Sequence, residues 1–491
     1  MGADMDLNKI TWGDDSAEKD PCLLEYFVDS AAFARLRAKT KSMVIGRKGS
    51  GKSALRKKLE QEFASDPNTY VVNLSPKYNS IRSVLNDQEI IEKYGEEIFF
   101  QHTWLRHILL DLLCRIGDAA KGQYAADSLA FARKVSVELN RTSKDLVENI
   151  TDVLSKIRAK AGSLGELGLQ VEQELRNVAE VESLEHHAIK LADAGARFVV
   201  LADDLDLGWD NSRTANNMLL GLLAAASHLS ARSPHIHIAI FMREDVYSLL
   251  VTQTQHADKY RNVERIRWEK SDLIRVLNSR IAFNLQRHGV PHPPNLFSVV
   301  FPETVGTSNT DNWLIERTLN RPRELIQLAR YYTEAVTGSD PDDRALKESE
   351  ANYSSWKLDD LCAEYSNQYP GLIQLFSHWK TKFFRHKYHL SGTEIREMLF
   401  QMMLEVTINE DWFNDLANGA DVDGLLRVLY EIGFIGDFVL GGEGGSKTFY
   451  SYSERHEPKF DEVQVHPCFR RAVNTVERIR NRKDDGPLAA G

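Results

Sequence analysis

The sequence predicts an α/β fold built on a parallel β-sheet, and three observations support it. Apolar, strand-like runs occupy 42–45, 70–74, 197–202 and 236–242. A good helix pattern at 217–229 separates the last two of these runs. The order strand, helix, strand is typical of right-handed parallel units, in which buried strands are continuously apolar.

Length, composition and charge narrow the class of protein. The chain has 491 residues, which corresponds to about three domains. Hydrophobic residues make up 42% and charged residues 27%, so a wholly disordered or low-complexity chain is excluded. The net charge of −10 argues against a uniformly basic nucleic-acid binder but allows a local basic surface.

The sequence favours a cytoplasmic protein without a membrane partner. No run approaches the ~20 apolar residues of a membrane span. The first 20 residues lack the basic flank and apolar run of a signal peptide. The four cysteines are scattered without metal-ligand or redox spacing, so we expect free thiols in a reducing compartment.

The segment 46–53 fits the phosphate-binding pattern G-x-x-x-x-G-K-[ST] in full. A strand-like run precedes it and a helix pattern at 54–63 follows, which disfavours a chance glycine turn. Glycines let successive backbone N–H groups face an anion. We expect Lys52 to reach the β- and γ-phosphates and the Ser53 hydroxyl to bind Mg²⁺. The predicted nucleotide-binding residues of this segment are Gly46, Arg47, Lys48, Gly49, Ser50, Gly51, Lys52, Ser53 and Ala54.

Two carboxylates follow the apolar run 198–202 directly. Ligands of parallel α/β folds bind beyond the carboxyl ends of the strands, so these acids should lie beside the phosphates. We expect Asp203 to hold Mg²⁺ together with Ser53, through a coordinated water. Asp204 would orient or deprotonate the attacking water. The alternative is that Asp204 and Asp206 only cap the start of a helix.

Arg243 ends the next apolar run and is a candidate catalytic residue. A strand between the phosphate loop and the acid strand would bring Arg243 within reach of the γ-phosphate, where it would stabilise transition-state charge. The competing interpretation is an ion pair with a neighbouring Asp that closes the strand. The segment 269–272 departs from the guanine-reading motif at its first position, Glu269, so ATP is favoured over GTP.

These motifs carry a family resemblance. The chain resembles the STAND/KAP-like branch of AAA-related P-loop ATPases in the order and spacing of three segments: 46–53, 201–206 and 241–245. More narrowly, it resembles bacterial members of the anti-phage-defence-associated type. The resemblance covers roughly residues 22–335. It implies an α/β P-loop NTPase fold and a Mg²⁺-dependent ATP hydrolase that oligomerises and controls a protein effector encoded nearby.

The resemblance extends to a lid helix. Residues 320–325 are similar to the arginine-bearing helix of AAA-like lids, which implies Arg323 as a second nucleotide sensor. An ordinary arginine after a proline in the first helical turn is the alternative. Where the family often has a catalytic Glu, this chain has Asp204, whose side chain has a shorter reach. An arginine finger supplied to a neighbouring subunit is one interpretation of three arginines, and a solvated basic face is the alternative for each: Arg261, Arg265 and Arg267.

The predicted organisation has four parts. A polar extension, 1–20, precedes an ATPase core at 21–290 that carries a helical insert at 117–185. A small helical lid follows at 291–345, and a C-terminal helical, winged-helix-like domain spans 346–491. The apolar stripe of the insert consists of Leu146, Ile150, Val153 and Ile157.

The winged-helix prediction rests on helix patterns at 391–407 and 421–432, followed by strand-like runs at 433–439 and 448–452. Winged helices bind DNA or dock proteins, and both alternatives stay open. Three interpretations follow: an ATP-driven switch or assembly ATPase, a DNA-binding ATPase, or an ATP-bound scaffold with little turnover. The basic C-terminal residues are Arg470, Arg471, Arg478, Arg480, Arg482 and Lys483.

Overall fold

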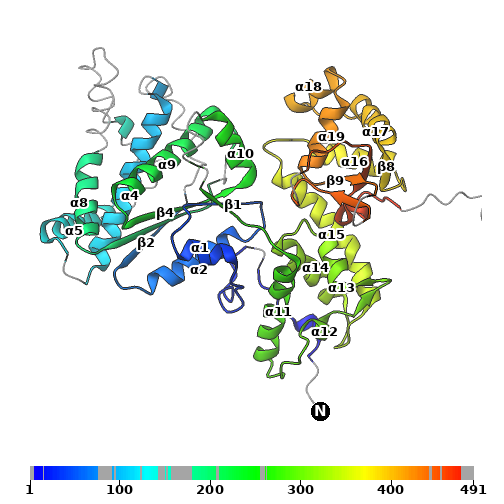
Figure 1. Ribbon diagram of the computed structural model, residues 1–491, viewed down its shortest axis with the longest axis horizontal. Coiled ribbons are helices and arrows are strands. Elements are labelled where there is room, and N and C mark those ends of the chain that lie inside the picture. The colour runs from blue at the N-terminus through cyan, green and yellow to red at the C-terminus, as the bar shows by residue number, and fades with distance from the viewer. Residues whose placement is uncertain are drawn as a thin grey trace, which may run out of the picture. The chain divides into compact units, whose positions relative to one another are not determined.

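The computed structural model describes residues 5–14, 16–75, 91–92, 95–121, 124–141, 150, 153–155, 180–205, 209–254, 260, 262–441, 445–453 and 456–476. The chain divides into two compact units. We call residues 16–267 the sheet unit, and residues 1–15 with 268–491 the helical unit (Figure 1).

The sheet unit contains a five-stranded parallel sheet in the order β2-β3-β4-β1-β5. Its strands are β1 (Met43–Gly46), β2 (Thr69–Leu74), β3 (Arg197–Ala202), β4 (Ile236–Arg243) and β5 (Val263–Arg265). The predicted α/β class and the strands β1 to β4 are thereby confirmed. The short strand β5 was not predicted, because three residues that include Glu264 and Arg265 carry no apolar run.

Helices cover both faces of this sheet (Figure 1). Alternate residues of a strand point to opposite faces, so Val44 packs with the first helix group and Met43 and Ile45 with the second. The first group is α1 (Ala31–Arg37) and α2 (Lys52–Ala64). The second group is α4 (Glu96–Ala119), α5 (Ala126–Arg141), α8 (Val181–Asp193), α9 (Arg213–Arg232) and α10 (Glu244–Gln253).

The helical part of the sheet unit begins earlier than the predicted insert boundary at 117. Helix α4 runs unbroken from Glu96 to Ala119 because its apolar face packs against α9, α5 and α8. Of the predicted apolar stripe, Ile150 and Val153 are buried. Leu146 and Ile157 lie outside the described residues.

The N-terminal residues belong to the helical unit and are not a free polar extension. Trp12 is buried, and its indole N–H donates to Thr333 Oγ1 at 2.9 Å. The backbone N–H of Leu7 donates to the Gly338 carbonyl. These contacts tie the segment to helices far along the chain, which explains why its four apolar residues carry no local pattern: Met5, Leu7, Ile10 and Trp12.

The division into units differs from the predicted boundaries at 290/291 and 345/346. The helical unit begins at Trp268, because α11 (Lys270–Arg287) packs on α14 (Pro322–Ala335). The second predicted boundary falls inside α15 (Asp343–Glu364), which is continuous and packs on α14. The smaller elements between them are α12 (Phe297–Val300), β6 (Thr304–Val305), β7 (Ser308–Asn309) and α13 (Thr310–Glu316).

The C-terminal part of the helical unit has an antiparallel sheet in the order β10-β9-β11-β8. The predicted helices are present as α17 and α19, and the predicted hairpin is β9 paired with β10. Helix α18 was not predicted. The elements are α16 (Leu372–Lys382), β8 (His389–Ser391), α17 (Gly392–Glu405), α18 (Asp411–Asn418), α19 (Val422–Glu431), β9 (Ile435–Val439), β10 (Lys447–Phe449), β11 (Glu462–Val465) and α20 (Pro467–Arg470).

Helix α17 begins with a capping box, which yields a stability prediction. The Ser391 hydroxyl accepts from the backbone N–H of Glu394, and the Glu394 carboxylate accepts from the backbone N–H of Ser391. Replacing Ser391 by Ala should lower the free energy of unfolding by about 0.5–2 kcal/mol in urea titrations. The control is Ser377→Ala on the exposed side of α16, where a change within about 0.5 kcal/mol is expected. Equal losses in both variants would contradict the capping role.

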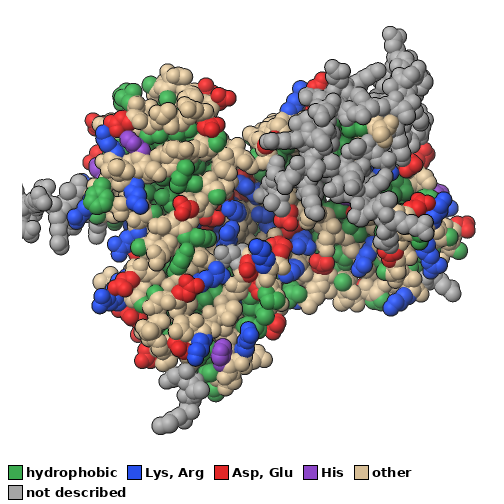
Figure 2. Space-filling view, turned by 180° about the vertical axis from the view of Figure 1, so that it is seen from behind, with side chains coloured by type: hydrophobic (Ala, Val, Ile, Leu, Met, Phe, Trp, Pro, Cys, Tyr) green, Lys and Arg blue, Asp and Glu red, His purple; other side chains and the backbone are tan. Residues whose placement is uncertain are grey.

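Within the described part of the chain, no helix is long and apolar enough to cross a membrane. On the face shown in Figure 2, basic and acidic side chains are interspersed over the described surface. Hydrophobic side chains lie among them in small groups. The surface of this face is therefore mixed in charge.

Candidate functional site

A tight loop connects β1 to α2 at residues 47–51. Gly49 and Gly51 have φ angles of 76° and 94°, a left-handed region that favours glycine. A Cβ added to Gly46 would lie 2.3 Å from Ser50 Oγ, so only glycine allows this approach without a shift of Ser50. The conformation of the loop therefore accounts for its glycines.

Lys52 is the first residue of α2, and its ammonium is held against the loop. Lys52 Nζ donates to the carbonyl oxygens of Gly46 and Arg47, at 3.0 and 3.2 Å. The N-terminus of α2 lies at the same place, and a helix N-terminus carries partial positive charge. Together they form an environment that favours an anion such as a phosphate.

The structure brings Asp203 to Ser53. Asp203 follows β3 and is 2% exposed. Its carboxylate accepts hydrogen bonds from the Ser53 hydroxyl and from the backbone N–H of Asp204. Burial raises the pKa of Asp203, while these bonds and the charges of Arg56 and Lys52 act in the opposite direction. A buried carboxylate of this kind is stabilised by a nearby cation.

Asp204 is half-buried and has a φ angle of 58°. It does not cap the helix that follows β3, because the Ser212 side chain occupies that position and accepts from the backbone N–H of Ala215. The helix-cap alternative is therefore wrong for Asp204 at α9, and Asp206 lies outside the described residues. A strained backbone at the end of a central strand is common at functional sites.

Arg243 lies opposite Gly46 in the pairing of β4 with β1. Its guanidinium makes a two-pronged ion pair with Asp245, from Nε at 3.0 Å and from Nη2 at 2.6 Å. The structure therefore shows the ion pair with a neighbouring Asp that the competing interpretation expects. Arg243 nevertheless ends the strand between β1 and β3, the position expected of a residue near the phosphate loop.

The other predicted arginines have partners outside this cluster, belong to the helical unit, or lie outside the described residues. Arg323 belongs to the helical unit, where it approaches Asp360 at 3.6 Å and stacks on the Trp356 ring. It follows Pro322 at the start of α14, as expected of an ordinary arginine in the first turn of a helix. Arg265 pairs with Glu244. Arg261 and the basic residues after 476 lie outside the described residues.

Two residues that lie near Ser53 and Asp203 were not predicted from the sequence. Arg56 lies one turn after Lys52, and its Nε donates to Asp203 Oδ2 at 3.2 Å. The Glu18 carboxylate lies near the Ser53 hydroxyl and 3.9 Å from Arg56 Nη2. The i, i+4 spacing on a helix could have identified Arg56. Glu18 had no such signal, because its contacts with α2 depend on the fold.

The donors around Ser53 suit a hard cation. They are hydroxyl and carboxylate oxygens, which Mg²⁺ prefers. The described residues contain no group of three or more His, Cys, Asp or Glu side chains arranged to hold a metal alone. Mg²⁺ at this place would therefore need further oxygens, and nucleotide phosphates are the usual source.

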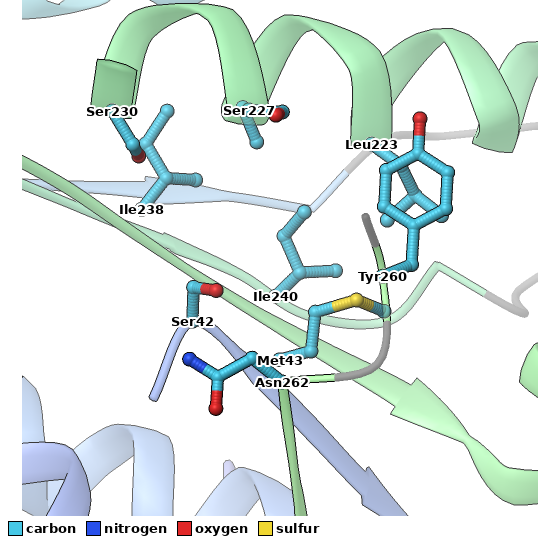
Figure 3. A pocket seen from close by; sticks show the side chains of 10 residues that line it. Ser42, Met43, Leu223, Ser227, Ser230, Ile238, Ile240, Tyr260 and Asn262 are labelled. Atoms are coloured by element: carbon cyan, nitrogen blue, oxygen red, sulfur yellow. The ribbon is translucent and has the colours of Figure 1, made fainter. Parts of the chain in front are cut away.

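A pocket of about 150 Å³ lies at the opposite end of β1 from the loop, among Ser42, Met43 and Ile240 (Figure 3). Helix α9 contributes Leu223, Ser227 and Ser230 to its wall (Figure 3). Ligand pockets usually measure about 300–1,000 Å³. This pocket is thus too small for a nucleotide and lies away from the carboxyl ends of the strands.

Comparison with known proteins finds two similarities. Residues 271–362 match the family described as the FunZ-associated C-terminal helical domain. The chain is also 22% identical, over 506 aligned residues, to a protein of Escherichia coli strain K12 named "Putative transposon gamma-delta 80.3 kDa protein". That alignment covers 94% of this chain and 67% of the relative. The family match begins within α11, close to the start of the main part of the helical unit.

Proposed function

We propose that this protein is a P-loop ATPase that binds ATP and Mg²⁺ at residues 46–53 and uses hydrolysis as a switch. The observation that carries the proposal is the meeting of Ser53 with Asp203, two residues far apart in sequence. Ser53 is the second residue of the helix after a glycine loop, and Asp203 follows β3, a buried strand of the same parallel sheet. The strand order β2-β3-β4-β1-β5 supports a nucleotide-binding α/β core.

Each residue has a distinct role in this proposal. Lys52 binds the β- and γ-phosphates, and the loop N–H groups bind the remaining phosphate oxygens. Ser53 and Asp203 hold Mg²⁺, which when bound neutralises phosphate charge. Asp204 orients the attacking water. Arg243 would stabilise the transferred phosphoryl group after exchanging part of its pairing with Asp245.

Lys52→Ala tests nucleotide binding. The variant should bind a fluorescent ATP analogue at least roughly 30-fold more weakly, because loss of one partner of a buried charge pair costs about 2–5 kcal/mol. Fluorescence anisotropy with Mg²⁺ present measures the affinity. Lys58→Ala, on the same helix but paired with Glu62, is the control and should bind like the wild type. Unaltered binding by Lys52→Ala would remove the central claim.

The resemblance supports the biological part of the proposal: a cytoplasmic homo-oligomer that controls a partner effector in prokaryotic anti-phage defence. Sedimentation with and without ATP would measure the oligomeric state, and the genes beside this one would identify an effector. A protein that stays monomeric with ATP, and whose neighbouring genes encode no effector, would contradict the biological part of the proposal. It would leave the proposed ATPase activity untouched.

A second candidate function is a DNA-binding ATPase. The name of the E. coli relative refers to a transposon, and transposons are DNA elements. The sheet β10-β9-β11-β8 with α17 and α19 supports a winged-helix interpretation of the C-terminal part. This function requires a surface of the chain that binds nucleic acid.

A further inference from the structure

A basic segment runs from the last residues of α16 through the turn after it to the first residue of β8. Residues 378–389 read His-Trp-Lys-Thr-Lys-Phe-Phe-Arg-His-Lys-Tyr-His and contain no acidic residue, in a chain of net charge −10. The four cations of this segment are all exposed: Lys380, Lys382, Arg385 and Lys387. Lys382 is paired with Glu405 at 2.7 Å, and Lys387 interacts electrostatically with Glu394, so the positive charge centres on Lys380 and Arg385 with a smaller share from Lys387.

The backbone of this segment is held in place by the chain near residue 475. The N–H of Arg385 donates to the Asn474 carbonyl at 2.9 Å, and the N–H of Tyr388 donates to the Val476 carbonyl at 3.0 Å. Arg385 has a φ angle of 58°. The Tyr388 ring lies under the Arg470 guanidinium, 3.6 Å from it. Arg385 and Lys387 are thus presented on an ordered turn and Lys380 on the last turn of α16, which lowers the entropic cost of binding.

Phe384 is the unusual residue of the turn. Its aromatic neighbours Trp379 and Phe383 are buried in the unit, but Phe384 is 63% exposed. An exposed phenylalanine close to cations is typical of surfaces where nucleic-acid bases stack. The apolar surface of Phe384 is therefore available to a ligand.

Helix α19 is a poor alternative for contact with nucleic acid. In a winged helix, the helix before the hairpin is the one that usually enters the groove. Here it exposes Asp423 and Glu431, and Asp421 caps it. Its one cation, Arg427, approaches Glu457 at 3.8 Å. Phosphates would be repelled by this helix and attracted by the turn at 380–388.

We propose that the turn at 380–388 binds single-stranded nucleic acid. Lys380, Arg385 and Lys387 contact the phosphates, and a base stacks on Phe384. Single strands are favoured over duplex because only an unstacked base exposes its face to an aromatic side chain. The proposal uses none of the residues of the ATP site, so the two can fail separately.

The test is the affinity of the full chain for a labelled oligothymidylate of about 20 nucleotides, measured between about 50 and 300 mM salt. Phe384→Ala should weaken binding roughly 5- to 150-fold. Lys380→Gln, Lys387→Gln and Arg385→Asn should each reduce the slope of log affinity against log salt by about 0.7. Asn is chosen at 385 because it tolerates a left-handed backbone.

The matched control is Arg287→Gln, which removes an exposed cation at the end of α11 in the same unit and should bind like the wild type. Circular dichroism checks that each variant is folded. Absence of wild-type binding at about 50 mM salt would overturn the proposal. So would wild-type affinity in the Phe384 and cation variants, which would leave this surface to a protein partner. Equal affinity for a duplex of the same length would overturn the single-strand preference.

Discussion

Replacing Asp204 by asparagine is expected to slow ATP-dependent phosphate release by roughly 10²–10⁴-fold, the usual contribution of a general base. Asp204 follows the central strand β3 next to the buried Asp203. Asparagine keeps the size of the side chain but cannot accept a proton from water. ATP affinity should change only a few-fold, because in the proposed site Lys52 and the loop, and not Asp204, bind the phosphates.

Steady-state phosphate release with saturating ATP and Mg²⁺ measures this effect. The control is Asp210→Asn, which makes the same chemical change at an exposed position after β3 and should leave turnover unchanged. Equal release by wild type and Asp204→Asn would remove the role assigned to Asp204. ATP binding without release by the wild type would favour the scaffold interpretation.

Lys357→Met is expected to destabilise the helical unit by about 3–5 kcal/mol, the cost of breaking a buried ion pair by removing one partner. Lys357 is 0% exposed, and its ammonium lies 2.9 Å from Glu324 and 3.3 Å from Asp360. Methionine fills similar space but leaves these buried carboxylates without that cation. The neighbouring pair of Arg321 and Glu364, at 2.7 Å, is equally buried.

Thermal and urea unfolding measure the loss. Lys347→Met lies on the same helix, where Lys347 forms an exposed pair with Asp343, and should cost about 0–1 kcal/mol. If both variants lose the same stability, the buried network is not what stabilises the packing of α14 on α15. The double variant Lys357→Met/Glu324→Gln should recover part of the loss, since it removes one uncompensated charge.

The effect of Lys357 should also depend on pH. Burial lowers the pKa of Lys357, but the carboxylates of Glu324, Asp360 and Glu364 outweigh it, so the pKa is raised above 10.5. A raised pKa means that the folded state favours the charged form. The contribution is therefore fully present below about pH 10.5 and is lost as the pH rises through the folded pKa. The stability difference between wild type and Lys357→Met should be constant near neutral pH and narrow only in strong alkali.

Local patterns were sufficient for much of the sheet unit. Strands β1 to β4 were predicted because strands buried on both faces are continuous apolar runs. The glycine loop at 46–53 could be predicted because the glycines, lysine and serine of its motif lie within a few residues of each other in the sequence. The proximity of Asp203 to Ser53 followed from a general rule, that the carboxyl ends of parallel strands meet at one edge of the sheet.

Tertiary structure alone decided the rest. Trp12 is buried against Thr333, and Glu18 contacts Ser53, through packing between segments that no sequence period links. The domain boundary at 267 rather than 290 depends on α11 packing against α14. The sequence left the partner of Arg243 open between a phosphate and a neighbouring carboxylate, and in the structure Arg243 pairs with Asp245. A sequence pattern reports what each residue requires from its neighbours along the chain, whereas these contacts depend on which distant surfaces the fold brings together.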